Sequence, residues 1–381
     1  MVNKLQIGDT VTLEQKSRRS FIKSLTASAT GVYGLKQVLT KTYGKEPEGR
    51  PLVLTRDLYG NPEKIRIVSP ERYQIVKEFE NLSENALREG LDHTIRLKQF
   101  SEKEDDIGFE ILINSDQSEV SLSDRRIRQL FNESRYSAQE SANSISTNNR
   151  EVKININRRR GKVMTRADAC GDRGDDKYEL LGGLGIAPYS GSTNGTLGIV
   201  AFGSDGNLVL ITADHVMEGD SKMYQVDSNP VGEFRNRDQS EDVTAYEFTG
   251  VGIAQHRAVK DIFGSNMYYL TGYWTFSGLS DYLMDSFLDC TLSGRTSCTV
   301  ENTVSDVFYN GNRVEHEVNM TERNAQGGDS GGPWVDNDGK LVAFHSGFVY
   351  NEYPIIGRAD ERDVATVAES ALNTLNADLM T

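Results

Sequence analysis

The sequence predicts an all-β fold for the second half of the chain, preceded by a small α+β segment. Three observations support this prediction. Beyond about Gly182, short apolar or alternating runs are separated by glycine, asparagine and aspartate, which is typical of antiparallel β-sandwiches and β-barrels. From about Gly49 to Arg150 the chain is charged and nearly free of glycine, and it alternates strand and helix patterns. A Ser/Asn-rich stretch over residues 137–149 is expected to be a linker between these two regions of different composition.

In the first segment we expect two strands, Leu52 to Thr55 and Lys64 to Ile67, on either side of the turn formers Tyr59-Gly60-Asn61-Pro62. A helix should follow, with Ser69 as its cap and Pro70 in its first turn. Apolar residues then recur at roughly helical spacing at Val76, Phe79, Leu82, Ala86 and Leu87. The remaining patterns of this segment are a strand over Ile107 to Asn114 and a helix around Ile127 to Phe131.

The second half contains six short runs that are expected to be strands of the all-β fold. They are Gly198 to Phe202, Leu208 to Thr212, Val243 to Phe248, Met267 to Trp274, Val304 to Tyr309 and Leu341 to Phe344. With 37% hydrophobic and 8% aromatic residues, the chain is within the globular range. No run reaches the roughly 18 apolar residues that a membrane-spanning helix needs, so no membrane is expected as a partner of the mature form.

The net charge of −14 is unevenly distributed. Residues 1–170 carry 29 Lys+Arg against 24 Asp+Glu, a balance of +5, whereas residues 171–381 carry 13 against 32, a balance of −19. Residues 171–381 are acidic enough to repel nucleic acid and anionic lipid, so neither is expected as a partner. The acid-rich, lysine-poor composition resembles that of secreted proteins from halophilic archaea.

The strongest chemical signal is the hexapeptide Gly328-Asp329-Ser330-Gly331-Gly332-Pro333. A serine hydroxyl needs a base to remove its proton and donors to hold the oxyanion that forms when it attacks a carbonyl. The neighbouring glycines permit a tight turn whose backbone N–H groups converge. The hexapeptide resembles the nucleophile motif of chymotrypsin-like serine proteases. That resemblance implies a double six-stranded antiparallel β-barrel over residues 171–381.

The same family has an apolar strand that ends in Thr-Ala-x-His, and this chain has Leu208-Val-Leu-Ile-Thr-Ala-Asp-His215. The resemblance therefore implies that His215 is the general base. The third member should lie at the start of a later strand, and Asp242-Val243-Thr244-Ala245 fits this pattern loosely because of its extra threonine. We expect Asp242 to orient His215, with Asp214, Asp220 and Asp238 as nearby alternatives. The order His, Asp, Ser is that of chymotrypsin.

The resemblance also assigns roles around the nucleophile. The N–H groups of Gly328 and Ser330 are expected to form the oxyanion hole. Trypsins have an aspartate six residues before the nucleophile, where this chain has Asn324, so a preference for Arg or Lys is not indicated. The expected substrate-binding residues are Asn324, Ala325, His345, Ser346 and Gly347. Because glutamate-specific relatives carry a histidine at the position of His345, cleavage after Glu or Asp is one hypothesis, although those relatives usually have Ser or Thr at the position of Ala325.

The three cysteines leave several pairings open. Cys290-Thr-Leu-Ser-Gly-Arg-Thr-Ser-Cys298 is similar to a segment in the second barrel of bacterial relatives, and in an exported protein Cys290 and Cys298 could pair. Cys170 would then remain, free or as the partner of either. Closely spaced pairs of Cys and His are absent from the sequence, so neither a metal nor a cofactor is expected.

Ser17-Arg18-Arg19-Ser20-Phe21-Ile22-Lys23 resembles a twin-arginine export signal, which predicts a secreted or cell-surface protein. The expected organisation is a signal region over residues 1–48, an α+β pro-segment over 49–136, a linker and processing region over 137–170 and the protease domain over 171–381. An accessory domain is the alternative to a pro-segment. Two sites for the mature start remain open, Leu180-Leu-Gly-Gly183 and Arg158-Arg-Arg160.

The sequence thus predicts a secreted serine endopeptidase whose partners are a protein or peptide substrate and its own pro-segment. Two other functions use the same residues. One is a binding protein that keeps the protease fold without its activity, and the other is an acyl hydrolase or esterase that shares the mechanism.

Overall fold

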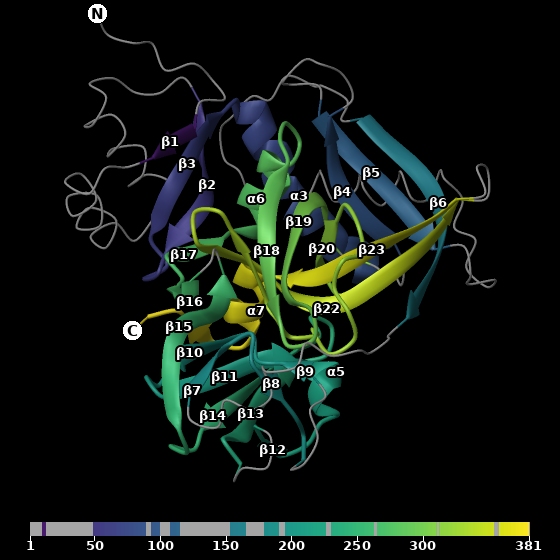
Figure 1. Cartoon of the computed structure of the whole chain (residues 1–381). Helices are drawn as coiled ribbons and strands as arrows, with labels where there is room; N and C mark the ends of the chain where they lie inside the picture. Colours follow the sequence, from purple (N-terminus) through teal and green to yellow (C-terminus); the bar gives the residue numbers. More distant parts are fainter. Residues whose placement is uncertain are drawn as a thin grey trace, which may run out of the picture.

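The computed structural model describes residues 10–12, 49–88, 93–99, 107–114, 153–164, 179–189, 195–225, 230–262, 265–309, 311, 313–353 and 358–380. Within these residues strands predominate and helices are few (Figure 1). The predicted all-β fold is confirmed. The first β-barrel lies at the bottom of Figure 1, the other strands of the second half of the chain occupy the middle, and the N-terminal segment lies above them.

The first barrel is built on a six-stranded sheet in which every neighbouring pair is antiparallel. Its strands, in spatial order, are β12 (Lys222–Met223), β13 (Gly232–Asp238), β14 (Val243–Phe248), β11 (Leu208–Ala213), β10 (Ile199–Gly203) and β24 (Ala377–Asp378). Their buried apolar side chains form two clusters. Ala213 lies opposite Val243, so the end of β11 and the start of β14 are adjacent. The residues that flank these two positions meet at one end of the sheet.

The second sheet has 13 strands rather than six. The second half of the chain contributes β17 (Gly272–Trp274), β18 (Leu288–Gly294), β19 (Cys298–Tyr309), β20 (His316–Met320), β21 (Pro333–Asp336), β22 (Lys340–Tyr353) and β23 (Arg358–Val367). The other strands are β1 (Thr10–Thr12), β2 (Arg50–Asp57), β3 (Pro62–Val68), β4 (His93–Gln99), β5 (Ile107–Asn114) and β6 (Lys153–Met164). The sheet is larger than predicted because β2 pairs with β17, β4 with β19 and β6 with β22.

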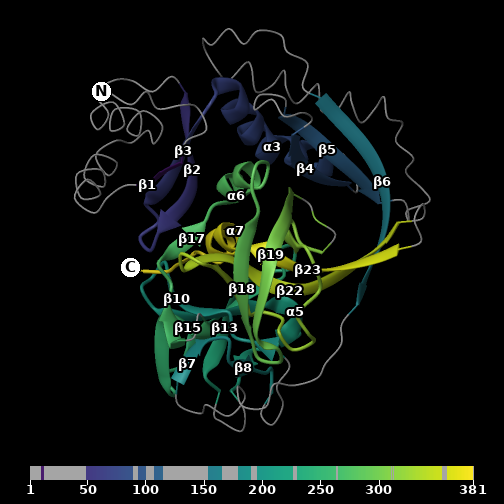
Figure 2. The same cartoon turned by 45° about the horizontal axis from the view of Figure 1, so that its top comes forward.

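Smaller elements complete the described part. A three-stranded sheet contains β16 (Ser265–Tyr269), β15 (Ile253–Ile262) and β7 (Glu179–Gly182), and a two-stranded one contains β8 (Gly185–Ile186) and β9 (Gly195–Thr196). The helices are α3 (Pro70–Arg88), α5 (Asp214–Met217), α6 (Phe276–Tyr282) and α7 (Ala368–Thr374). In the turned view of Figure 2, α3 lies above α6, between the strands β2 and β3 and the strands β4 and β5.

The local predictions for the N-terminal segment agree with the structure. The expected strands lie within β2, β3 and β5, and the expected helix is α3. The Ser69 hydroxyl accepts a hydrogen bond from the N–H of Arg72 at 3.0 Å, as a helix cap does. Gly60, in the predicted turn, has φ of +74°, a conformation that favours glycine.

One predicted strand is divided in two. Met267 to Trp274 was expected to be continuous, but it forms the end of β16 and the whole of β17. Between them, the N–H of Leu270 donates to the carbonyl of Arg257 at 2.9 Å, and that of Thr271 donates to the carbonyl of Gly339 at 2.9 Å. The chain therefore passes from one sheet to the other at this point.

Several predictions fall on residues outside the described part: the export motif at 17–23, the helix at 127–131, the linker at 137–149 and Cys170. Arg158 to Arg160, in contrast, lie in β6, where their backbone is paired with β5 and β22. This site is a paired strand rather than an exposed loop. Among the described helices, none is long and apolar enough to cross a membrane.

Candidate active site

His215 and Asp242 are in direct contact. His215 lies in the short helix α5, two residues after the end of β11, and Asp242 immediately precedes β14. The Nδ1 atom of His215 lies 2.9 Å and 2.8 Å from the two carboxylate oxygens of Asp242. The backbone N–H of His215 donates to Asp242 Oδ1 at 3.0 Å. Asp242 has φ of +50°, which is uncommon outside glycine and tolerated by aspartate.

This contact distinguishes Asp242 from the alternative aspartates. In the described part of the chain, neither Asp214 nor Asp220 nor Asp238 forms a hydrogen bond with the imidazole. Asp214 has a buried carboxylate oxygen without a hydrogen bond, and its nearest cation is Arg237 at 4.0 Å. The extra Thr244 donates its hydroxyl hydrogen to the carbonyl of Asn236 in β13 at 3.2 Å, so it does not occupy the space between the two residues.

The Asp242 carboxylate fixes the protonation of the ring. A carboxylate can only accept a hydrogen bond, so Nδ1 must carry the proton and Nε2 is left with a free lone pair. Burial on its own would raise the pKa of Asp242. The hydrogen bonds from His215 and the positive charge of Arg313 outweigh burial, and the pKa lies below its usual value. Asp242 is therefore ionised at neutral pH.

Arg313, in the connection between β19 and β20, was not anticipated from the sequence. Its Nη2 atom lies 3.1 Å from His215 Nδ1 and 3.5 Å from Asp242 Oδ2, and its side chain is 15% exposed. Gly347 lies beside it, since a Cβ atom there would be in ordinary van der Waals contact with the guanidinium, at 3.4 Å. The segment Asn312-Arg313-Val314 has no motif character, so only the fold reveals this position.

Ser330 lies in the tight turn between residues 328 and 332, beside the strand end that leads to His215. Its side chain is buried, with 7% exposed. A Cβ atom on Gly331 would lie 2.2 Å from the hydroxyl oxygen of Thr212 and 3.1 Å from the backbone nitrogen of Ala213. The carbonyl of Ser330 accepts a hydrogen bond from the N–H of Thr196 at 2.8 Å. The nucleophile turn thus packs on the end of β11, and glycine at 331 permits that approach.

The predicted oxyanion donors are unoccupied. In the part of the chain that the structure describes, no group accepts a hydrogen bond from the N–H of Gly328 or of Ser330. Gly328 has φ of +95°, and its carbonyl accepts from the Thr196 hydroxyl at 2.7 Å, which fixes the peptide plane on the carbonyl side. Two backbone donors in one turn are the arrangement that binds a developing negative charge on oxygen.

The Asp329 carboxylate anchors a neighbouring loop. Oδ1 accepts hydrogen bonds from the backbone N–H groups of Thr296 and Ser297, at 2.7 Å and 2.9 Å, and Oδ2 accepts one from Gln326 at 2.9 Å. The side chain is fully buried. Both carboxylate oxygens therefore bind backbone N–H groups of neighbouring residues.

The predicted substrate residues Asn324 and Ala325 are hydrogen-bonded to Asp363, a buried acid that the sequence did not reveal. Their N–H groups donate to Asp363 Oδ2 at 2.8 Å and 3.0 Å, and the side chain of Asn302 donates to the same oxygen at 3.3 Å. Asp363 Oδ1 is buried and has no hydrogen bond to any of the residues that the structure describes. Burial, the largest cause, raises the pKa of Asp363 to about 6.

His345 supports the nucleophile turn through its backbone. Its N–H donates to the carbonyl of Gly332 at 2.8 Å, and its carbonyl accepts from the N–H of Gly331 at 2.7 Å. The ring is 2% exposed and packs edge-on against Trp334 at a centroid distance of 6.1 Å. Burial lowers the pKa of His345 to about 4, so the ring is neutral at neutral pH. At neutral pH this ring can therefore act on a substrate carboxylate as a hydrogen-bond donor, but not as a cation.

Ser346 and Gly347 follow His345 in β22. The Ser346 hydroxyl lies 3.3 Å from that of Thr366, which donates in turn to the carbonyl of Glu241, the neighbour of Asp242, at 2.6 Å. Gly347 has φ of +145° at an irregularity in the pairing of β22 with β23. These two residues therefore connect the expected substrate strand with the chain beside Asp242 and with Arg313.

The predicted pairing of Cys290 with Cys298 is wrong. Cys290 is a free, buried thiol. In the hairpin of β18 and β19, Cys290 lies opposite Asn302 whereas Cys298 lies opposite Gly294. Four residues of strand separate the two positions, roughly 13 Å, whereas a disulfide needs Cα atoms within about 7 Å. In the described residues, no group of three or more His, Cys, Asp or Glu side chains could hold a metal ion.

Comparison with known proteins gives matches to solved structures only. No family model and no curated protein matches this chain. A Nocardiopsis protease has 18% identity and a TM-score of 0.40, and the match covers 53% of this chain and all of the protease. A serine protease described as glutamic-acid-specific, with a histidine triad in substrate binding, has 19% identity and the same TM-score over 52% of this chain and 99% of its own.

A homologue of α-lytic protease, N4, has 16% identity and a TM-score of 0.40, with 53% of this chain and 99% of the homologue covered. At such identities the residue roles of these proteases do not transfer to this chain. The candidate site therefore rests on its own contacts: the pair of His215 and Asp242, and the Ser330 turn, which packs on the end of β11 and makes no hydrogen bond to His215 in the described part of the chain.

Proposed function

We propose that this chain is a serine endopeptidase that hydrolyses peptide bonds through an acyl-enzyme on Ser330. The observation that carries the proposal is the hydrogen-bonded pair of His215 and Asp242 next to the turn that holds Ser330. An ionised carboxylate on Nδ1 leaves Nε2 as the basic nitrogen, which is the form of histidine that activates a serine.

In the proposed mechanism, Ser330 Oγ attacks the scissile carbonyl while His215 Nε2 takes the hydroxyl proton. The N–H groups of Gly328 and Ser330 donate to the oxyanion of the tetrahedral intermediate. His215 then gives the proton to the leaving amine, the C–N bond breaks, and an ester on Ser330 remains. Water attacks this ester with His215 again as the base, which releases the acid and restores the hydroxyl.

A fluorophosphonate probe, which reacts with activated serines, tests the proposal. The parent chain is expected to be labelled, and Ser330→Ala is expected to lose labelling. Ser204→Ala, at an exposed serine in the first barrel, is the matched control and should label like the parent. Absence of labelling in a correctly folded parent would favour the second candidate, a binding protein that keeps the fold without the activity.

An esterase or other acyl hydrolase would use the same groups and would be labelled as well. Digestion of casein compared with hydrolysis of simple esters separates the two activities. Cleavage of casein at a rate that depends on Ser330 supports the endopeptidase, whereas hydrolysis of esters alone supports the acyl hydrolase. A peptide library then gives the residue preferred before the cleaved bond.

The proposal includes export by the twin-arginine route and cleavage of the chain between the N-terminal segment, as a pro-segment, and the catalytic half. This part of the proposal is supported by the motif around Arg18 and Arg19 and by the change in amino-acid composition before residue 171. Replacing both arginines by lysine is expected to keep the protein inside the producing cell. N-terminal sequencing of the exported parent then gives the mature start and decides between the two processing sites.

A further inference from the structure

The N-terminal segment completes the sheet of the catalytic half. β2 pairs with β17 through Gly272 opposite Asp57, Tyr273 opposite Arg56 and Trp274 opposite Thr55. Beyond this ladder, the N–H of Thr275 donates to the carbonyl of Leu54 at 3.0 Å, and its hydroxyl donates to the carbonyl of Val53 at 2.7 Å. Without β2, the β17 strand would have an open edge with unpaired backbone groups.

The two parts also share one hydrophobic core. Phe79 of α3 stacks on Phe276 of α6 at a centroid distance of 5.4 Å and an interplanar angle of 9°, and both rings are buried. Leu52 and Leu54 of β2 belong to the same buried cluster as Trp274 of the catalytic half. The contact between α6 and β2 is close. A Cβ atom on Gly278 would lie 2.4 Å from the backbone of Leu54.

A buried ion pair joins the segment to α6. Arg72 Nε lies 2.6 Å from Asp281 Oδ1, and both side chains are fully buried. Arg72 Nη2 also donates to the Asp281 carbonyl at 3.1 Å and to Asp285 Oδ2 at 3.0 Å, while Arg66 binds both acids. An ionised carboxylate that loses its partner in such a place is strongly unfavourable. Asp281 therefore depends on the N-terminal segment.

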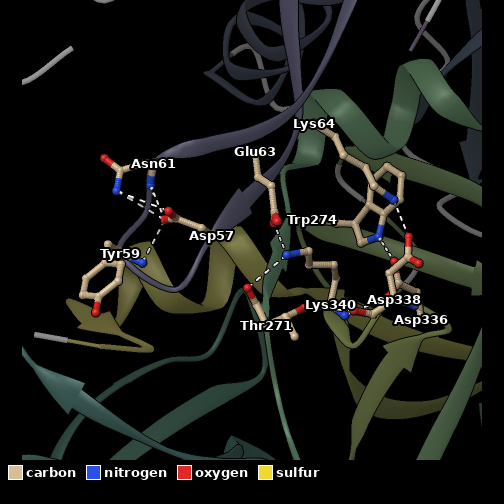
Figure 3. A network of polar contacts seen from close by, with 10 residues as sticks. All are labelled: Asp57, Tyr59, Asn61, Glu63, Lys64, Thr271, Trp274, Asp336, Asp338 and Lys340. Atoms are coloured by element: carbon tan, nitrogen blue, oxygen red, sulfur yellow. Dashed lines mark hydrogen bonds and ion pairs between the residues drawn. The ribbon is translucent and has the colours of Figure 1, made fainter. Parts of the chain in front are cut away.

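A second polar contact lies beside β17 (Figure 3). The Lys340 ammonium group forms a salt bridge with Glu63 of β3 and donates to the carbonyl of Thr271 at 2.9 Å. The Lys340 side chain is 2% exposed and that of Glu63 is 12% exposed. Close by, Lys64 pairs with Asp338, which is 61% exposed. One buried pair and one surface pair therefore connect the same two parts.

From these contacts we propose that residues 49–88 remain assembled with the catalytic half after the chain is cut between them, as a permanent noncovalent part of the mature enzyme. A segment that is removed must leave a surface that tolerates water. Here its departure would uncover Trp274, Phe276 and the Asp281 carboxylate together. The inference rests on the proposed function only in taking the chain to be cut during maturation.

The test uses the full chain with Ser330→Ala, so that it does not depend on the activity of the protein. A recognition sequence for a site-specific protease replaces part of residues 137–149, and the chain is cut there. Size-exclusion chromatography in native buffer is then compared with a denaturing gel. The expected result is that both fragments co-elute in native buffer and separate in denaturant. Elution of the N-terminal fragment on its own overturns the proposal, whether or not the catalytic half stays folded.

Two further variants of the cut chain test the assigned contacts. Asp285→Asn weakens the buried cluster around Arg72 but leaves Asp281 in place, so the chain should still fold. The fragments of this variant are expected to separate at a lower urea concentration than those of the parent. Lys64→Met, which removes the surface pair with Asp338, is the control and should separate like the parent. Equal shifts for both variants, or no shift for Asp285→Asn, contradict the assignment.

Discussion

The guanidinium of Arg313 lies 3.5 Å from the carboxylate of Asp242, and its Nη2 atom lies 3.1 Å from the nitrogen of His215 that faces this carboxylate. An arginine N–H can only donate, and Nδ1 donates to Asp242, so two donors face each other at this short distance. The positive charge of Arg313 helps to lower the pKa of Asp242. It also weakens the electrostatic attraction between the Asp242 carboxylate and a positively charged imidazole ring.

Replacement of Arg313 is thus expected to change the pH dependence of the reaction. In Arg313→Gln, Asp242 loses a positive charge that lowers its pKa, so its carboxylate is protonated at higher pH and the acid limb of the kcat/KM profile should move to higher pH. Peptide hydrolysis measured between pH 4 and 9 checks this. Arg235→Gln, at an arginine that pairs with Asp205 on the surface of the first barrel, should leave the limb in place. A limb that moves to lower pH contradicts the argument.

Asp242→Asn is expected to lower kcat by roughly 10⁴-fold, as the equivalent change does in serine proteases of this type. The asparagine amide can offer a donor to Nδ1, which selects the tautomer with the proton on Nε2, and that nitrogen can then no longer act as a base. Single-turnover hydrolysis of an ester substrate measures the loss. Circular dichroism checks that the loss is not caused by unfolding. Activity within tenfold of the parent would show that another group orients His215.

The structure makes Asp329 a support of the nucleophile turn. In Asp329→Asn, one carboxylate oxygen becomes an amide nitrogen that faces a backbone N–H of Thr296, Ser297 or Gln326. The lost acceptor is buried, so the free energy of unfolding should fall by about 1–3 kcal/mol, with slower labelling of Ser330 by the fluorophosphonate probe. Asp289→Asn, at an exposed acid that accepts from the Thr303 hydroxyl, is the control. Equal stability of the two variants argues against this role.

What the sequence predicted well was local. Most expected strands and the cap at Ser69 each follow from a few neighbouring residues with a strong pattern. The pairing of β2 with β17 could not be predicted in this way, because it joins residues more than 200 positions apart. A three-residue strand such as β17 has too few residues to show which neighbour it prefers.

The misses at the site have the same origin. Arg313 and Asp363 are charged residues in unremarkable segments, and only the approach of distant strands gives them their surroundings. The Cys290 pairing failed because closeness in sequence was taken for closeness in space, whereas the register of β18 and β19 keeps the two cysteines apart. The contact of Asp242 with His215 agrees with the sequence pattern in spite of a loose motif, because Asp242 immediately precedes a clear strand, β14.

Asp363 provides a prediction for stability against pH. Its folded-state pKa of about 6 lies above the unfolded value of about 4, because burial penalises the charged form more than the N–H groups of Asn324 and Ala325 favour it. A raised pKa means that the contribution of this group is fully present below about pH 4 and is lost as the pH rises to about 6. Above pH 6, the ionised carboxylate destabilises the folded state by a constant amount.

Asp363→Asn removes this titration and keeps an oxygen that can accept from the two N–H groups. Relative to the parent, the variant is expected to gain stability as the pH rises from 4 to 6, by about 3 kcal/mol at most, and to keep the gain at higher pH. Urea unfolding at pH 4, 5, 6 and 7 measures the difference. The exposed Asp220→Asn should show no such trend. A difference between Asp363→Asn and the parent that does not vary with pH would mean that Asp363 titrates alike in both states.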